Sequence, residues 1–229
     1  MHFLNGVVQA ISETFDLPEP VLEIGSYLTP GREEIANLRQ FFTGKSYVGI
    51  DIRPGPGVDQ VADVECLPHA DGSVGTVLCL STLEHVQRFW RAFDELHRVL
   101  RPDGVLVISV PFNIRIHNHP SDYWRFTPEA VDLLLEDYPS RLIGWHGPVE
   151  RPENIWAVAF REARPAITEA QFRDYERLVQ RYARQPLPLR RKVRYRLIEW
   201  INGHRLCAPF LEQEKCETYL RSDARALAG

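Results

Sequence analysis

The chain has 229 residues, a formal net charge of -4 at pH 7, 44% hydrophobic residues and 25% charged residues. That balance is typical of a globular protein and excludes a disordered chain, and no run approaches the roughly 20 apolar residues that a membrane-spanning helix needs. The acidic balance also argues against general binding to nucleic acid.

Short apolar runs alternate with helical patterns through the first half of the chain. In chain order we expect a helix over residues 3–15, a strand over 21–24, a helix opening at Thr29-Pro30, and strands over 47–50, 58–61 and 76–80. Each strand is nearly continuous in apolar residues, as in a parallel sheet covered by helices on both faces.

The second half begins with the same alternation. We expect a helix over 88–100 stopped by Pro102-Asp103-Gly104, a strand over 105–110, a polar loop over 111–122, a helix over 127–138, and an antiparallel strand pair over 141–145 and 155–160. From Ile167 onward the composition becomes helical, with a break at 185–188. The pattern predicts an α/β fold, a Rossmann-like, doubly wound, mostly parallel sheet with an antiparallel closing strand over residues 1–163, and a C-terminal helical extension over 164–229.

The start of the chain and its cysteines indicate a reducing compartment. The first fifteen residues lack a basic leading region and a small-residue cleavage site, so we expect no signal peptide and a cytoplasmic protein. The four cysteines stand far apart without a C-x-x-C pair, which favours unbridged thiols over disulfides or zinc. Cys79 lies inside an apolar strand and is expected in the core.

Residues 21–63 give the first indication of a ligand. The first strand stops at Gly25, where the absence of a Cβ lets the backbone turn sharply and approach a ligand. Ser26 adds a hydroxyl and an amide near the following helix start. The next strand ends in Asp51, 26 positions after Gly25, where a nucleotide-binding βαβ unit places a carboxylate for the ribose hydroxyls. The stretch predicts a nucleoside-containing cofactor; a tight turn and a strand-end aspartate are the alternative explanations of the single residues.

Six segments, taken in order, give a family resemblance. They are EIGS at 23–26, GIDIRPGPGVD at 49–59, VADVECLP at 61–68, LSTLEHV at 80–86, ELHRVLRPDGVLVISVPF at 95–112 and HPSDYWRFTPEA at 119–130. Over about residues 19–138 the chain resembles the class I S-adenosylmethionine-dependent methyltransferases, of the kind that act on small molecules or glycans.

The resemblance implies S-adenosyl-L-methionine as the cofactor and assigns its contacts. Glu23, a carboxylate that is costly in an apolar strand unless paired, would orient the turn and the methionine amino end. Asp51 would accept hydrogen bonds from both ribose hydroxyls, and Asp63 and Val64 would lie beside the adenine. The other cofactor residues implied are Gly25, Ser26, Ile52 and Ser81.

The glycine pattern departs from that family. Tyr27 and Thr29 stand where further glycines are expected, and glycine returns only at Gly31. The departure weakens one alternative, a nicotinamide-dependent oxidoreductase, because a pyrophosphate needs the closely approaching amides of G-x-G-x-x-G. A non-catalytic nucleoside-binding scaffold protein is the second alternative.

Titratable residues after the fourth and fifth strands are the candidate catalytic groups. Methyl transfer is an in-line displacement at an activated sulfonium carbon, so alignment supplies most of the acceleration. A general base is needed when the acceptor is a hydroxyl or a protonated amine. The candidates are His85, His117, His119, Asp122 and Tyr123; a structural role is the alternative for His85.

The loop after the fifth strand also raises the question of a metal. Two histidines and a carboxylate, His117, His119 and Asp122, can bind a divalent ion. Pro120 and the lack of a further ligand argue against this set, so no metal site is predicted.

The aromatic residues that follow are expected beside the acceptor. Tyr123 and Trp124 would form a wall of the acceptor pocket, while Arg125 pairs with a carboxylate. The alternative is that Trp124 and Phe126 belong only to the core.

The C-terminal third is basic. Residues 161–205 contain twelve basic residues against five acidic ones. Such a patch can bind an anionic substrate, nucleic acid or a membrane surface, but a solvated helical face or a homodimer contact through these helices is the more frequent explanation. We expect a small-molecule or glycan-type acceptor and no nucleic acid, because no motif of interleaved basic and aromatic residues is present.

Overall fold

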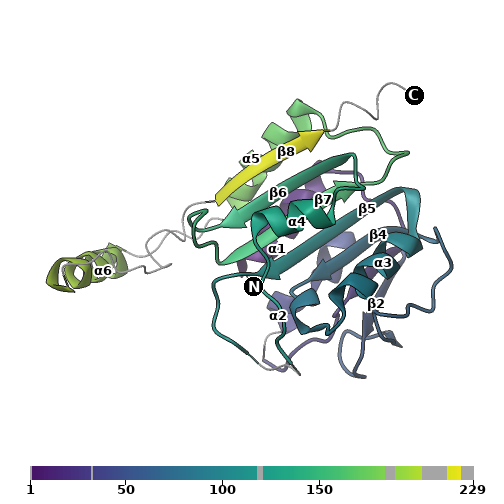
Figure 1. The fold of residues 1–229 in the computed structure, drawn as a ribbon, viewed down its shortest axis with the longest axis horizontal. Coiled ribbons are helices and arrows are strands. Elements are labelled where there is room, and N and C mark those ends of the chain that lie inside the picture. The colour runs from purple at the N-terminus through teal and green to yellow at the C-terminus, as the bar shows by residue number, and fades with distance from the viewer. Residues whose placement is uncertain (1, 32, 118–120, 184–188, 203–215, 223–229) are drawn as a thin grey trace.

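A computed structural model describes residues 2–31, 33–117, 121–183, 189–202 and 216–222. Within them, eight strands form one mixed sheet in the order β3-β2-β1-β4-β5-β7-β6-β8 (Figure 1). The strands are β1 Val21–Ile24, β2 Tyr47–Asp51, β3 Gln60–Val61, β4 Val74–Leu80, β5 Leu100–Pro111, β6 Ser140–His146, β7 Asn154–Phe160 and β8 Cys216–Ser222.

The topology confirms the predicted fold class. Strands β1 to β5 are parallel, and the strand order reverses at β1, which pairs with both β2 and β4. β7 is antiparallel to its neighbours β5 and β6. A dinucleotide-binding sheet has the order 3-2-1-4-5-6; here the antiparallel β7 separates β5 from β6.

Helices cover both faces of the sheet (Figure 1). They are α1 His2–Thr14, α2 Glu33–Ala36, the 3₁₀ helices η1 Leu38–Phe42 and η2 Leu83–His85, α3 Phe89–Val99, α4 Pro128–Leu134, α5 Glu169–Tyr182 and α6 Leu189–Asn202. The core of α3 and α4 includes Val77 of β4, whereas the core of α1 and α5 includes the next residue, Leu78. Successive strand residues point to opposite faces, so one strand contributes to both cores.

Side-chain caps explain where the later helices begin. Thr127 accepts a hydrogen bond from the Ala130 amide at 3.1 Å, and Pro128 occupies the first turn. Thr168 and Gln171 form a capping box at the start of α5. The helix predicted over 127–138 is shorter than expected, because α4 ends at Leu134.

Two elements of the first half differ from the predictions. The helix expected from Thr29-Pro30 begins only at Glu33 and ends after four residues, and Asn37 then caps η1 by accepting from the Arg39 amide at 3.1 Å. β5 begins at Leu100, ahead of the expected turn at 102–104. The register between β4 and β5 shifts there, since Val74 pairs with Leu100 but Thr76 pairs with Val105, and the extra residues remain within the strand.

The segment after residue 163 contributes to the same layers. Tyr175 of α5 is buried, and its hydroxyl accepts a hydrogen bond from Nε1 of Trp156 in β7 at 2.7 Å. β8 was not expected, and it pairs antiparallel with β6 along its whole length. The expected break at 185–188, Arg184, Arg205 and Cys207 lie outside the described residues.

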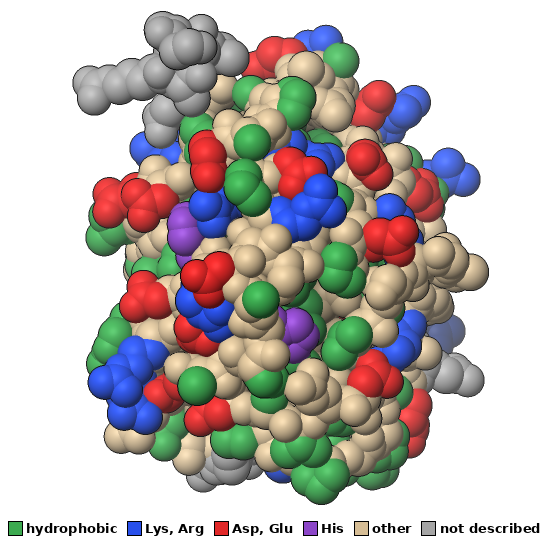
Figure 2. Space-filling model, turned by 90° about the vertical axis from the view of Figure 1, so that its right-hand side faces the viewer, with side chains coloured by type: hydrophobic (Ala, Val, Ile, Leu, Met, Phe, Trp, Pro, Cys, Tyr) green, Lys and Arg blue, Asp and Glu red, His purple; other side chains and the backbone are tan. Residues whose placement is uncertain are grey.

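The surface shows no single-sign patch on the face drawn in Figure 2, where acidic and basic side chains are interspersed. α6 stands apart from the sheet (Figure 1), and its Trp200 is 82% exposed. Cys79 is buried in the core, as predicted. No helix among the described residues has the length and apolar character needed to cross a membrane.

Candidate functional site

A cavity of about 1060 Å³ opens at the carboxyl ends of β1, β2 and β4. Open α/β sheets bind ligands at this edge, next to the strand where the order reverses. The cavity brings together most of the predicted site residues: Glu23, Gly25, Ser26, Asp51, Ile52, Asp63, Val64, Ser81, His85, His117 and Tyr123. The cavity extends from a β1–β2 end, lined by Gly25 and Asp51, to a β4–β5 end, lined by His85 and His117.

The turn after β1 depends on Gly25. Its φ is +80°, and a Cβ at this position would lie 2.2 Å from Oγ1 of Thr82. The Gly25 and Ser26 amides both donate to the carbonyl of Ile50, at 2.8 and 3.0 Å, which fixes the turn against β2. Ser81, at the end of β4, also has a positive φ of 49°. Two tight turns therefore bring backbone to the cavity wall, at positions where longer side chains are strained.

Asp51 lies at the end of β2 with its carboxylate largely buried. Oδ1 accepts from the Arg53 amide at 3.0 Å, and Oδ2 accepts from the Tyr27 amide at 3.4 Å. The Arg53 guanidinium lies 4.5 Å from the centre of the Tyr27 ring and 3.5 Å from Oδ1. Tyr27, which stands where the family pattern has a further glycine, thus holds the Arg53 guanidinium beside the Asp51 carboxylate.

Glu23 is a buried carboxyl group in β1. Burial raises its pKa to about 7, and the hydrogen bond from the Tyr47 hydroxyl at 2.6 Å and the charge of Arg39 offset this only in part. Burial and the neighbouring Glu23 in turn raise the pKa of Tyr47. The Glu23 carboxyl that lines the cavity is therefore about half protonated near neutral pH.

The end of the cavity near β3 is more open. Asp63 is exposed, and its Oδ1 accepts from the Glu65 amide at 2.9 Å. Val64 is buried, whereas Ile52 is 60% exposed. These side chains offer an apolar surface and a carboxylate at the rim of the cavity.

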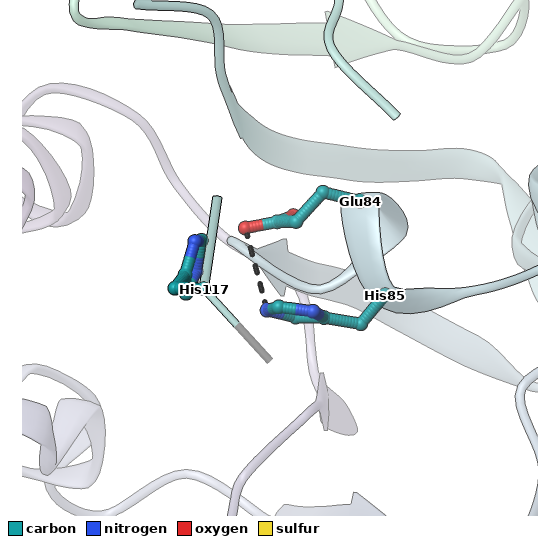
Figure 3. A group of neighbouring side chains, drawn as sticks. All are labelled: Glu84, His85 and His117. Carbon is teal, nitrogen blue, oxygen red and sulfur yellow. Dashed lines mark ion pairs between the residues drawn. The ribbon is translucent and has the colours of Figure 1, made fainter. Parts of the chain in front are cut away.

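The β4–β5 end contains three converging side chains. Figure 3 shows Glu84 and His85 on η2, directly after β4, facing His117 from the loop after β5. Nε2 of His85 lies 3.8 Å from a carboxylate oxygen of Glu84, and the two imidazole rings are 5.0 Å apart, edge to face. Glu84 has no exposed surface, and burial raises its pKa to about 8.

Neighbouring groups orient both imidazoles. Nδ1 of His85 makes a short hydrogen bond with the carbonyl of Ser121. Nδ1 of His117 lies 3.2 Å from the carboxylate of Asp122, which also accepts from the His117 amide at 2.8 Å. The Arg125 guanidinium pairs with Asp122 and holds the pKa of that carboxyl far below its usual range.

The candidate catalytic residues in the loop after β5 differ in whether their side chains reach the cavity. Tyr123 lines the cavity, but the Asp122 side chain has no exposed surface and does not line it. Arg125 and His117 hold this carboxylate inside the loop, away from the cavity. Arg125 pairs with a carboxylate as expected. His119 lies outside the described residues.

Of the two aromatic residues expected beside the acceptor, Tyr123 lines the cavity and Trp124 does not. Trp124 was expected beside it, but it packs on Phe89, and its Nε1 donates to the carbonyl of Val86 at 3.0 Å. Phe126 belongs to the core. The alternative of core residues therefore holds for Trp124 and Phe126.

Sequence reasoning missed Glu84. Its carboxylate becomes enclosed because the Tyr123 and Trp124 amides both bond to the Glu84 carbonyl, at 2.7 and 3.3 Å. The only signal in the sequence is an acidic residue directly before His85 at the end of a strand.

The family model and the relatives that match this chain are all described as methyltransferases. The family model described as a methyltransferase domain matches residues 30–108. An uncharacterized methyltransferase of Mycobacterium sp. (strain KMS) is 38% identical over 112 residues, 44% of this chain and 42% of the relative. One from Mycolicibacterium gilvum is 37% identical over 78 residues, 29% of this chain and 31% of the relative. The chain thus spans less than half the length of these relatives.

Solved structures share the fold. The 1,6-didemethyltoxoflavin-N1-methyltransferase of Burkholderia thailandensis, with S-adenosylhomocysteine bound, aligns with a TM-score of 0.54 and 19% identity over 69% of this chain and 78% of its own. An S-adenosylmethionine-dependent methyltransferase of Archaeoglobus fulgidus gives 0.54 and 15%, over 69% and 93%. These matches agree with the resemblance seen in the sequence: residues 30–108 match a methyltransferase domain, and the fold is shared with S-adenosylmethionine-dependent methyltransferases.

Proposed function

We propose that the protein transfers a methyl group from S-adenosyl-L-methionine to an oxygen or nitrogen of a small-molecule or glycan-type acceptor. One observation carries the proposal: a single cavity at the carboxyl end of the sheet joins the Gly25 turn and Asp51 to the imidazoles of His85 and His117. A cavity of this size has room for a cofactor and an acceptor next to each other, as in-line methyl transfer requires.

The β1–β2 end suits the cofactor. Asp51 presents a carboxylate for the ribose hydroxyls, although the Arg53 side chain has to move away from Oδ1 first. Glu23 is placed to attract the ammonium of the methionine moiety, and the glycine turn lets that moiety approach the backbone. The rim formed by Val64 and Asp63 suits the adenine, with apolar contact and an acceptor for its amine.

The β4–β5 end suits the acceptor. His85 and His117 line the cavity, and contacts at Nδ1 orient both rings: the Ser121 carbonyl for His85, and the Arg115 carbonyl and the Asp122 carboxylate for His117. Either imidazole can take a proton from a hydroxyl or an ammonium group as its nucleophile attacks. Tyr123 contributes an aromatic wall at the same end.

We also propose that the protein is cytoplasmic and forms a homodimer. Cys66, Cys79 and Cys216 form no disulfide within the part of the chain that the structure describes, which supports a reducing, cytoplasmic location. The exposed apolar side chains of α6 support a homodimer.

Titration calorimetry tests the cofactor. We expect S-adenosylmethionine and S-adenosylhomocysteine to bind with one site per chain, and NAD not to bind. Binding of NAD instead would favour the oxidoreductase. Transfer of a labelled methyl group into a fractionated small-molecule or glycan extract then separates an enzyme from a scaffold, since a scaffold binds both sulfur ligands without turnover.

A further inference from the structure

The cluster at the β4–β5 end has the composition of a metal site. We propose that Glu84, His85 and His117 bind a divalent transition-metal ion such as Zn²⁺. One ligand atom from each lies within 4.8 Å of the other two, and Figure 3 shows the three side chains pointing toward a common point. Two imidazoles and a carboxylate are a donor set of catalytic zinc and of other open transition-metal sites.

In both histidines, Nδ1 contacts an oxygen acceptor, which leaves Nε2 as the nitrogen that would bind a metal ion. Metal-binding imidazoles generally donate their other N–H to a carbonyl or a carboxylate, which fixes the tautomer and the ring orientation. His85 makes this contact with the Ser121 carbonyl, and His117 makes it with the Arg115 carbonyl at 3.3 Å, with the Asp122 carboxylate 3.2 Å from the same nitrogen. The Asp122–Arg125 pair, which does not reach the cavity, therefore has a role in orienting His117.

The buried carboxylate of Glu84 is an independent indication that a cation binds here. Its side chain lines the cavity but is almost fully buried, and neither carboxylate oxygen accepts a hydrogen bond from another described residue. A buried carboxyl group without such partners is costly. A cation held between Glu84 and the two imidazoles would remove that cost.

The geometry requires a small adjustment. With donors about 2.1 Å from a tetrahedral zinc ion, the donor atoms lie roughly 3.4 Å apart, so the most distant pair has to close by on the order of 1 Å. The Nε2–Oε1 separation of 3.8 Å is already near this value. Three protein ligands leave a coordination position open to the cavity.

The ligand set differs from the one considered in the sequence. That set joined His117, His119 and Asp122 on one loop, whereas the proposed set joins two loops at adjacent strand ends. A role in catalysis rests on the proposed function: an acceptor hydroxyl in the open position would have its pKa lowered by the ion. Binding of the metal itself does not depend on that function.

Metal titration tests the site directly. Protein without an affinity tag is treated with a chelator, desalted and titrated calorimetrically with ZnCl₂, with MgCl₂ as the comparison. We expect one saturable equivalent of Zn²⁺ and no comparable binding of Mg²⁺, which prefers oxygen ligands. Glu84→Gln, His85→Asn and His117→Asn should each weaken Zn²⁺ binding at least about tenfold.

Glu65→Gln is the matched control. Glu65 is a carboxylate that lines the same cavity, but it pairs with Arg88 at 2.6 Å and lies outside the cluster. Zn²⁺ affinity should be unchanged in this variant. Circular dichroism verifies folding, and if Glu84→Gln does not fold, the variant of the partly exposed His117 decides the question.

Three results would contradict the proposed metal site. Absence of saturable Zn²⁺ binding, preference for Mg²⁺, or Zn²⁺ binding that is unchanged in His117→Asn would refute the metal site. Binding of S-adenosylhomocysteine to the same metal-free preparation is measured in parallel. If that ligand binds and Zn²⁺ does not, the metal proposal fails and the proposed function stands; the reverse result leaves the metal site and removes the methyltransferase.

Discussion

Asp51 is the residue on which we expect cofactor affinity to depend most. Asp51→Ala should weaken binding of S-adenosylhomocysteine by on the order of 1–3 kcal/mol, the scale of hydrogen bonds to a charged group. Isothermal calorimetry at constant pH and salt measures the change. An unchanged dissociation constant would show that the ribose is not held by this carboxylate.

Asp59→Ala is the control for Asp51→Ala, because it also removes a carboxylate that accepts a hydrogen bond from a backbone amide. Its carboxylate accepts from the Gly49 amide of β2 at 2.7 Å, yet it does not line the cavity. Asp59→Ala should therefore lower the unfolding free energy without changing the affinity by more than about twofold, within the additivity of separated sites. Equal affinity losses in the two variants would instead indicate a general effect on β2.

Glu23 should make stability depend on pH. Its pKa is near 4.5 in the unfolded chain and about 7 in the folded protein, so the folded state favours the neutral form. The associated stability is fully present below pH 4.5 and is lost as the pH rises through 7, by on the order of 3 kcal/mol. Urea unfolding of the ligand-free protein at several pH values measures this loss.

Glu23→Gln is the informative comparison, because the amide keeps the shape and can still accept from the Tyr47 hydroxyl. Between pH 5 and 8 its unfolding free energy should fall less than that of the parent protein. Parallel curves for the two proteins would mean that Glu23 titrates at its ordinary pKa.

At the scale of elements, a fully buried hydrogen bond joins α5 to the sheet. Tyr175→Phe removes the acceptor of the 2.7 Å hydrogen bond and leaves the Trp156 Nε1–H buried without it. We expect a loss of about 1–3 kcal/mol in unfolding free energy, measured by urea denaturation.

Tyr182→Phe removes the same hydroxyl from the same helix. That hydroxyl donates to Glu13 at 2.9 Å, and the contact is exposed. Its loss should change the unfolding free energy by less than about 0.5 kcal/mol, as for surface substitutions. If Tyr182→Phe destabilised as much as Tyr175→Phe, burial would not be what makes the inner contact important.

The strands that the sequence predicts well are those buried on both faces. β1, β2, β4 and β7 are apolar runs, and such runs report burial directly. β8 is different, because Glu217, Thr218 and Arg221 interrupt its apolar residues and its partner β6 lies about 75 positions away. An edge strand of mixed character is defined by its pairing rather than by its own composition.

The same distinction applies to the site. Gly25 and Asp51 were predictable because a glycine turn and a strand-end carboxylate follow from the local βαβ pattern. The environment of Glu84 was not, because it depends on backbone contacts from residues 123 and 124. The enclosed position of Asp122 was not predictable for a related reason: its i+3 pair with Arg125 holds the carboxylate within the loop.

At the scale of the whole molecule, α6 is the surface expected to join two copies. Leu189, Val193, Leu197 and Trp200 are each at least half exposed, and their spacing of four, four and three residues places them on one helix face. Pairing two such faces removes this apolar surface from water. We predict a dimer by light scattering coupled to gel filtration, and a monomer for Leu197→Glu.

Leu133→Glu is the control for the added charge. Leu133 is similarly exposed but lies on α4, away from α6. This variant should keep the mass of the parent protein. A parent protein that is monomeric, or a Leu197→Glu variant that remains dimeric, would contradict assembly through α6.

The position of β8 also affects how the protein is made. β6 is buried along its whole length and pairs with β7 on one side and β8 on the other. During synthesis, β7 follows β6 directly, but β8 is not available until residue 222 has left the ribosome. Until then the β6 edge presents unpaired amides and carbonyls in an apolar strand, the kind of edge that recruits strands from other chains. Nascent chains stalled between β7 and β8 are thus the stage at which this protein is most exposed to aggregation and most dependent on chaperones.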